Sequence, residues 1–173
     1  MNVQINYKNI PSEKNSVNHV LFVDEFFNIL NLKKHLLSKE YSFIEDLLKT
    51  TDFDKQIISI DIHSKKKIIL VSLKKNLSNS EAETLGAKFY NQFKDLKQTD
   101  YNINTETIPD KSKNLFGYFL HGLKLKSYKF EKYKSKKNKK ILSIYITGKN
   151  KTSVKDQIKF KAIEDGTFYT RDL

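Results

Sequence analysis

The segment 114–140 constrains the fold of this chain more than any other stretch, because it changes character twice. Its first half carries apolar residues at intervals of three and four, the spacing of a helix that buries one face. These residues are Leu115, Phe116, Phe119, Leu120 and Leu123. Further on, Tyr128 and Phe130 alternate with Lys129 and Glu131, which predicts a short, half-buried strand. The lysine run that follows cannot be buried. The segment therefore predicts a helix, a strand and a solvated loop, in that order.

Six other stretches are typical of strands, because they either alternate apolar and polar residues or form short apolar runs. They are Val3–Tyr7, His19–Val23, Ile58–Ile62, Ile68–Leu73, Tyr101–Thr105 and Ile141–Ile146. The continuous apolar run of the second stretch predicts a strand in the centre of a sheet. The polar residues Ser64–Lys67 separate the third and fourth stretches, which predicts a hairpin.

Helical spacing returns in three further segments, 43–48, 82–96 and 154–162, and each follows a serine that could cap it. The pairs that predict a helix start are Ser42 with Glu45, Ser80 with Glu83, and Ser153 with Asp156. Strands adjoin in the first half of the chain and alternate with helices in the second half. This pattern predicts an α/β fold with three layers, a mixed β-sheet flanked by helices. A length of 173 residues fits a single domain.

The positive charge of the chain is concentrated in one place. The formal net charge is +12, and the segment 124–140 contributes nine lysines against one glutamate. The nine are Lys124, Lys126, Lys129, Lys132, Lys134, Lys136, Lys137, Lys139 and Lys140. Aromatic residues interleave with these lysines, as they do on some nucleic-acid-binding surfaces. A solvated loop explains the same pattern and is the interpretation we favour. The alternative is a stand-alone basic module that binds nucleic acid, such as DNA, through this patch.

No group of residues in the sequence could carry catalysis. The histidines His19, His35, His63 and His121 include no pair at the spacing of a helical zinc site. The acidic pairs Asp24–Glu25, Glu45–Asp46 and Asp52 with Asp54 lie beside predicted caps or strand ends, where carboxylates are normally solvated. The five glycines form no loop that could cradle a phosphate. We therefore predict no catalytic residue and no metal ligand in this chain.

The sequence also indicates in which cellular compartment the protein is expected. There is no cysteine, no apolar run of about 18 residues and no apolar signal-peptide core at the N-terminus. These features fit a cytoplasmic protein without disulfides, and we expect no contact with a membrane.

Two motifs resemble the leucyl (cytosol) aminopeptidase family. The first is the run Tyr128–Lys134, YKFEKYK, which follows a helix and precedes a lysine-rich turn. The second is Thr170–Leu173, TRDL, at the end of the last predicted helix. In that family the corresponding segments close an N-terminal domain of macro-domain-like fold and lead into a catalytic metallopeptidase domain. The resemblance thus implies a macro-like domain over residues 1–152 and, over residues 153–173, a helix leading towards a catalytic domain outside this chain.

The resemblance carries further implications for function. The parent protein would be a cytoplasmic homohexamer that removes N-terminal amino acids from peptides with two divalent metals, Zn or Mn. Those metals and all catalytic residues would lie in the catalytic domain, and this chain would serve assembly or regulation. We also expect Val154, Ile158, Ala162 and Ile163 to pack on this domain. Phe168 and Tyr169 would instead face the catalytic half.

Overall fold

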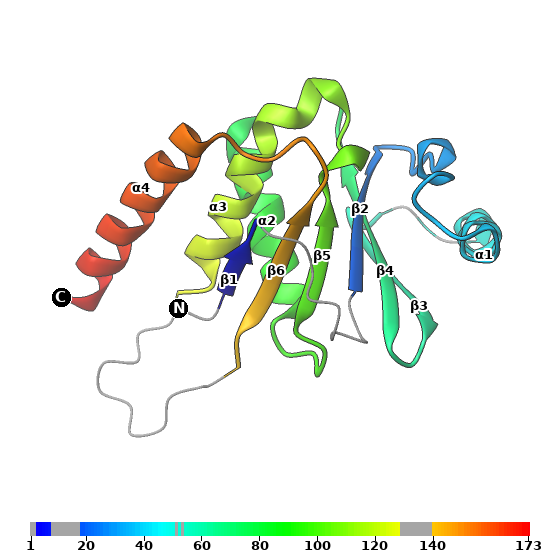
Figure 1. Cartoon of the computed structure of the whole chain (residues 1–173), viewed down its shortest axis with the longest axis horizontal. Helices are drawn as coiled ribbons and strands as arrows, with labels where there is room; N and C mark the ends of the chain where they lie inside the picture. The colour runs from blue at the N-terminus through cyan, green and yellow to red at the C-terminus, as the bar shows by residue number, and fades with distance from the viewer. Residues whose placement is uncertain (1–2, 8–17, 51, 53, 129–139) are drawn as a thin grey trace.

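The computed structural model describes residues 3–7, 18–50, 52, 54–128 and 140–173. Six strands form one sheet in the order β1-β6-β5-β2-β4-β3 (Figure 1). The strands are β1 (Val3–Asn6), β2 (Asn18–Asp24), β3 (Ile57–His63), β4 (Lys66–Leu73), β5 (Asp100–Asn104) and β6 (Leu142–Thr147). All neighbouring pairs are parallel except β3 and β4, which form the predicted antiparallel hairpin.

Helices cover both faces of the sheet, as Figure 1 shows. The four α-helices are α1 (Ser38–Thr50), α2 (Asn79–Phe93), α3 (Phe116–Lys126) and α4 (Val154–Asp172). The short 3-10 helices are η1 (Leu30–Leu32), η2 (Thr105–Thr107) and η3 (Asp110–Leu115). Helix α1 lies on one face, α2 and α3 lie on the other, and α4 lies outside α3. The predicted three-layer α/β architecture is confirmed.

Strand β2 explains why the sheet needs helices on both sides. Val20 and Phe22 enter the core beneath α2 and α3, while Leu21 and Val23 enter the core beneath α1. A strand with apolar side chains in both directions is stable only when both faces of the sheet are covered. The predicted central position of this strand is confirmed, since β2 pairs with β4 on one side and β5 on the other.

Helices α2 and α3 approach each other closely because two glycines face the contact. A Cβ atom added at Gly86 would collide with the carbonyl oxygen of Phe119, and one added at Gly122 would collide with that of Glu83. The large side chains between these backbones and the sheet include Phe89, which is fully buried. The two helices thus cover the sheet as one packed layer.

Two predicted helix starts are wrong. The capping box of α2 is formed by Ser78 and Glu81, two residues before the predicted pair Ser80 and Glu83. Both pairs satisfy the same pattern, and the packing of α2 selects the earlier one. Helix α1 begins at Ser38, so the predicted cap Ser42 lies inside the helix.

The third start is confirmed, because the Ser153 hydroxyl accepts a hydrogen bond of 3.1 Å from the Asp156 N–H group at the start of α4. The strand predicted around Tyr128 and Phe130 can be compared with the structure only at Tyr128. Tyr128 is described and lies in no strand after the end of α3, whereas Phe130 lies outside the described residues.

Candidate functional site

Three of the nine lysines predicted as a nucleic-acid-binding patch belong to the described residues. Lys124 and Lys126 lie in the last turn of α3, and Lys140 precedes β6. The other six, Lys129, Lys132, Lys134, Lys136, Lys137 and Lys139, lie outside the described residues. The Lys124 ammonium is 2.6 Å from the carboxylate of Glu164 on α4, so its charge is already paired within the domain.

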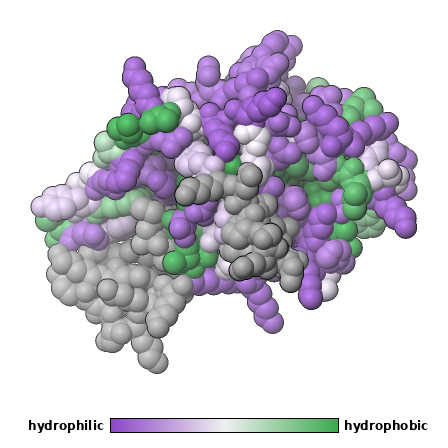
Figure 2. All heavy atoms as spheres, viewed as in Figure 1, coloured by the Kyte–Doolittle hydropathy of each residue, from purple (hydrophilic) through white to green (hydrophobic). Residues whose placement is uncertain are grey.

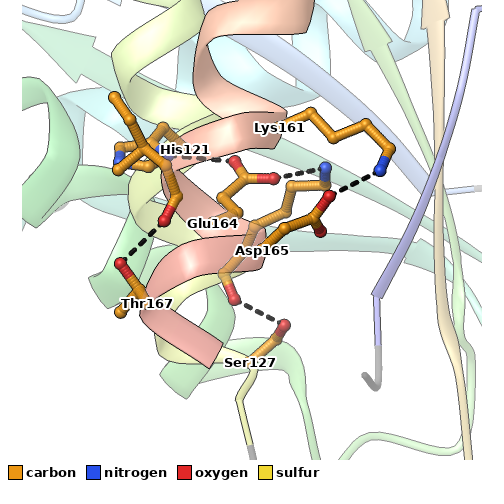
Figure 3. Close-up of polar contacts among 8 residues, drawn as sticks. His121, Ser127, Lys161, Glu164, Asp165 and Thr167 are labelled. Atoms are coloured by element: carbon orange, nitrogen blue, oxygen red, sulfur yellow. Dashed lines mark hydrogen bonds and ion pairs between the residues drawn. The ribbon is translucent and has the colours of Figure 1, made fainter. Parts of the chain in front are cut away.

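Glu164 is the polar centre of the contact between α3 and α4. Only 2% of this glutamate is exposed, although it lies in the outermost helix of the molecule. Its Oε1 atom is 2.9 Å from His121 Nδ1, and its Oε2 atom accepts the hydrogen bond from Lys124 (Figure 3). Because a carboxylate can only accept, His121 Nδ1 carries the proton of this bond. Both oxygens of the buried acid are therefore paired with residues of α3.

Aromatic rings surround this polar centre. The His121 ring lies against Phe160 of α4, with 4.9 Å between ring centroids, and Phe160 also meets Tyr118 edge to face at 5.0 Å. Gly117 lets Phe160 approach α3, since an added Cβ atom would meet that ring at 2.7 Å. Phe160 is the only large apolar side chain of α4 that is buried within the described structure.

The last turn of α4 is held by a second set of contacts to Tyr128. The Tyr128 hydroxyl donates a 2.5 Å hydrogen bond to Asp172, and its ring stacks on Phe168 with 5.1 Å between centroids. The guanidinium carbon of Arg171 lies 5.4 Å from the centre of the same ring. We expected Phe168 to face another domain, and this is wrong, because the ring is half-buried against Tyr128.

The outer face of α4 carries apolar side chains that nothing in the described structure covers. Val154, Ile158 and Ile163 are 71%, 65% and 45% exposed, and Tyr169 is exposed as well. Figure 2 shows hydrophobic side chains on the surface over this helix, at the upper left. The expectation that Val154, Ile158, Ala162 and Ile163 pack on this domain is therefore wrong. The pairing of Glu164 with α3 fixes the rotation of α4 and turns this stripe outwards.

A crevice lies at the carboxyl ends of β2 and β4, where ligands bind in many open α/β sheets. Its volume is about 450 Å³, and its walls include Asp24, Glu25 and Phe26. The Asp24 carboxylate accepts hydrogen bonds from the N–H groups of Phe26 and Asn28, at 3.0 and 2.9 Å, and so stabilises the turn after β2. Among the described residues, no three potential metal ligands come together there or elsewhere.

The histidines lie apart from one another and serve different contacts. His35 Nδ1 is 3.1 Å from the Asn104 side chain, and His63 Nδ1 accepts a hydrogen bond from the Lys65 N–H group in the β3–β4 turn. Burial lowers the pKa of His19 and that of His35 below the usual histidine value. No described pair of histidines forms a common site.

Sequence comparison assigns no family to this chain: no protein-family model and no curated protein matches it. Solved structures match its fold. A mutant of tomato leucine aminopeptidase aligns with 95% of this chain at a TM-score of 0.57 and 17% identity. The macrodomain of Thermus aquaticus DarG aligns with 85% of this chain and 98% of its own length, at a TM-score of 0.50 and 8% identity. The fold is macrodomain-like.

The two likenesses differ in how much of the other protein they cover. The chain spans 35% of the tomato aminopeptidase, but it matches nearly the whole DarG macrodomain. At these identities the likeness shows the fold alone. Among the described helices, none is long and apolar enough to cross a membrane.

Proposed function

We propose that this chain is the non-catalytic N-terminal domain of a leucyl aminopeptidase, a metal-dependent exopeptidase that removes N-terminal amino acids from peptides. The observation that carries the proposal is the outer face of α4, where Val154, Ile158 and Tyr169 are exposed along one helix. Four of the ten large apolar side chains that are exposed in the described structure belong to this helix. Apolar side chains gathered on one exposed face are typical of a surface that contacts another domain.

The likeness to tomato leucine aminopeptidase supports this proposal in two ways. It covers almost all of this chain, and it leaves nearly two-thirds of that protein for other domains. Tyr128, the first residue of the motif YKFEKYK, contacts the last turn of α4, and the motif TRDL lies at the end of that helix. In this proposal α4 leads towards the catalytic domain, and its exposed face is covered there.

Several features of the parent protein follow from the same proposal. The catalytic domain would hold two divalent metals, Zn or Mn, and supply every catalytic residue. The parent would be a cytoplasmic homohexamer, and this domain would support subunit contacts rather than the reaction. The single-domain chain would have no peptidase activity of its own.

The mass and activity of the native protein test the proposal. An antiserum raised against this domain should detect a native polypeptide nearly three times the 20.3 kDa of this chain, in proportion to the 35% coverage. That polypeptide should hydrolyse leucine p-nitroanilide and lose this activity on chelation of divalent metals. The isolated 173-residue chain serves as the control and should be inactive with Zn or Mn added. A native polypeptide of about 20 kDa would refute the proposal.

A further inference from the structure

Among the described residues, strand β1 is the outermost strand at one edge of the sheet. It pairs on one side with β6, where Val3 lies opposite Leu142 and Ile5 opposite Ile144. On the other side the described residues provide no neighbouring strand. In such an edge strand, alternate backbone N–H and C=O groups point away from the sheet without a strand partner. These groups form a template on which another extended chain can pair.

A groove of about 340 Å³ follows this open edge. It is lined from β1 by Val3, Gln4 and Ile5. The side chain of Gln4 points to the opposite face of the sheet from those of Val3 and Ile5. A cavity that touches all three therefore runs along the edge of the strand and not over one face. Its other wall comes from α3 and α4.

The walls of the groove combine an apolar floor with cationic side chains. The floor contains Leu120 of α3 and Phe160 of α4, both buried. Lys124 and Lys161 line it from the same two helices. Past the end of β1, Lys151 places its ammonium 2.8 Å from the carbonyl oxygen of Tyr7.

We propose that this groove binds an extended, acidic peptide segment that adds a strand to β1. The four residues of β1 span about 13 Å at the rise of a strand, which suits four residues of an added strand. Main-chain hydrogen bonds to β1 would supply affinity, and alternate side chains of the peptide would reach the apolar floor. This inference stands independently of the proposed aminopeptidase function.

The charge of the groove selects an acidic partner. Its one lining carboxylate, Glu164, has both oxygens engaged by His121 and Lys124 and so offers no acceptor to a peptide. Lys161 is exposed at the rim, where it forms only a surface pair with Asp165 at 2.7 Å. A glutamate side chain of the peptide can reach this ammonium without breaking a buried contact.

The probe is the acetylated, amidated hexapeptide TVEVTE, titrated into the 15N-labelled chain and followed by NMR. We expect amide shifts in β1, in Gln157–Glu164 of α4 and in Gly117–Lys124 of α3, with slowed hydrogen exchange in β1. The matched control is the same peptide with a methyl group on every backbone nitrogen, so that neither of its edges can donate a hydrogen bond to β1. Equal binding of this control would refute strand addition.

A charge reversal tests the acidic preference. Lys161→Glu should weaken binding of the hexapeptide by about threefold or more, as expected for reversal of an exposed charge pair. Lys155→Glu, an exposed lysine on α4 that does not line the groove, should leave the affinity unchanged and serves as the matched control. Equal effects of the two substitutions, or no shifts in β1 at millimolar peptide, would overturn the proposal. Amides of free β1 that all exchange as slowly as those of β5 would also overturn it.

Discussion

Helices α1 and α4 each contact the rest of the domain through a buried glutamate. The two helices differ in how many apolar side chains they bury beside it. On α1, Glu40 accepts a hydrogen bond from Lys66 of β4, and the same helix buries Tyr41, Ile44 and Leu48 in the core. On α4, Glu164 is paired with both His121 and Lys124, yet Phe160 is the only apolar side chain of this helix that is buried in the described structure. Helix α1 is held mainly by apolar burial, whereas α4 depends on its polar centre.

The two helices place their apolar side chains differently: α1 buries most of them, whereas α4 exposes most of them. Burial of one large apolar side chain contributes about 1.5–3 kcal/mol, so the three on α1 outweigh its single ion pair. Helix α4 has apolar residues as well, but Val154 and Ile158 face away from the domain. A helix that is anchored by charge and exposes its apolar stripe is suited to hold a second contact on its outer side.

The largest effect should follow from removing apolar burial on α1. Ile44 is fully buried, so Ile44→Ala should lower the free energy of unfolding of the whole domain by about 2–5 kcal/mol. Urea unfolding followed by circular dichroism measures this change. Phe43→Ala, at a half-exposed neighbouring position, is the matched control and should change stability by about 0.5 kcal/mol or less. Similar losses for both variants would mean that α1 is not held by its buried side.

A smaller and local effect should follow from Glu164→Gln. The amide keeps the size of the side chain but loses the charge that His121 and Lys124 share, at a cost of about 1.5–3 kcal/mol. We expect this cost to appear as faster amide hydrogen exchange in α4, while α1 and the central strands keep their exchange rates. Residue-resolved hydrogen exchange measures the rates in α4 and those in α1 and the central strands.

The control for that experiment lies on the opposite side of the same helix. Ile158→Glu changes an exposed residue, so exchange in α4 of this chain should stay as in the unchanged protein. If Ile158→Glu accelerates exchange as much as Glu164→Gln does, the outer face is part of the packing, and the contrast between α1 and α4 fails.

The sequence allowed the sheet to be predicted better than the helix ends. Runs such as Val20–Val23 can only be satisfied in a covered sheet, so the central strand and the layers follow from local pattern. The start of α2 does not, because Ser78 with Glu81 and Ser80 with Glu83 fit the same capping rule. Tertiary packing decides between registers that are locally equivalent.

The polar centre of α4 was missed for a related reason. Its partners His121 and Lys124 lie 43 and 40 residues before Glu164, and no local rule connects them. One signal was present: Phe160, Glu164 and Phe168 recur every four residues and mark a second stripe on the helix. An acid between two aromatic residues on one helical face was evidence that this face, and not that of Ile158, is the buried one.

The smallest expected effect concerns the lysine-rich segment that follows α3 in the sequence. Replacing Lys134, Lys136, Lys137, Lys139 and Lys140 by alanine should leave affinity for duplex DNA unchanged if the segment is a solvated loop. Fluorescence anisotropy with a labelled duplex at several salt concentrations measures both affinity and its salt dependence. Each lysine that neutralises a phosphate would instead contribute about 0.9 to the slope of log affinity against log salt. The matched charge control replaces five lysines in and around α1, which are Lys33, Lys34, Lys39, Lys49 and Lys55. A loss of salt slope confined to the first variant would establish the basic patch as a nucleic-acid surface, and it would give this lysine-rich segment a function that the lysines around α1 do not share.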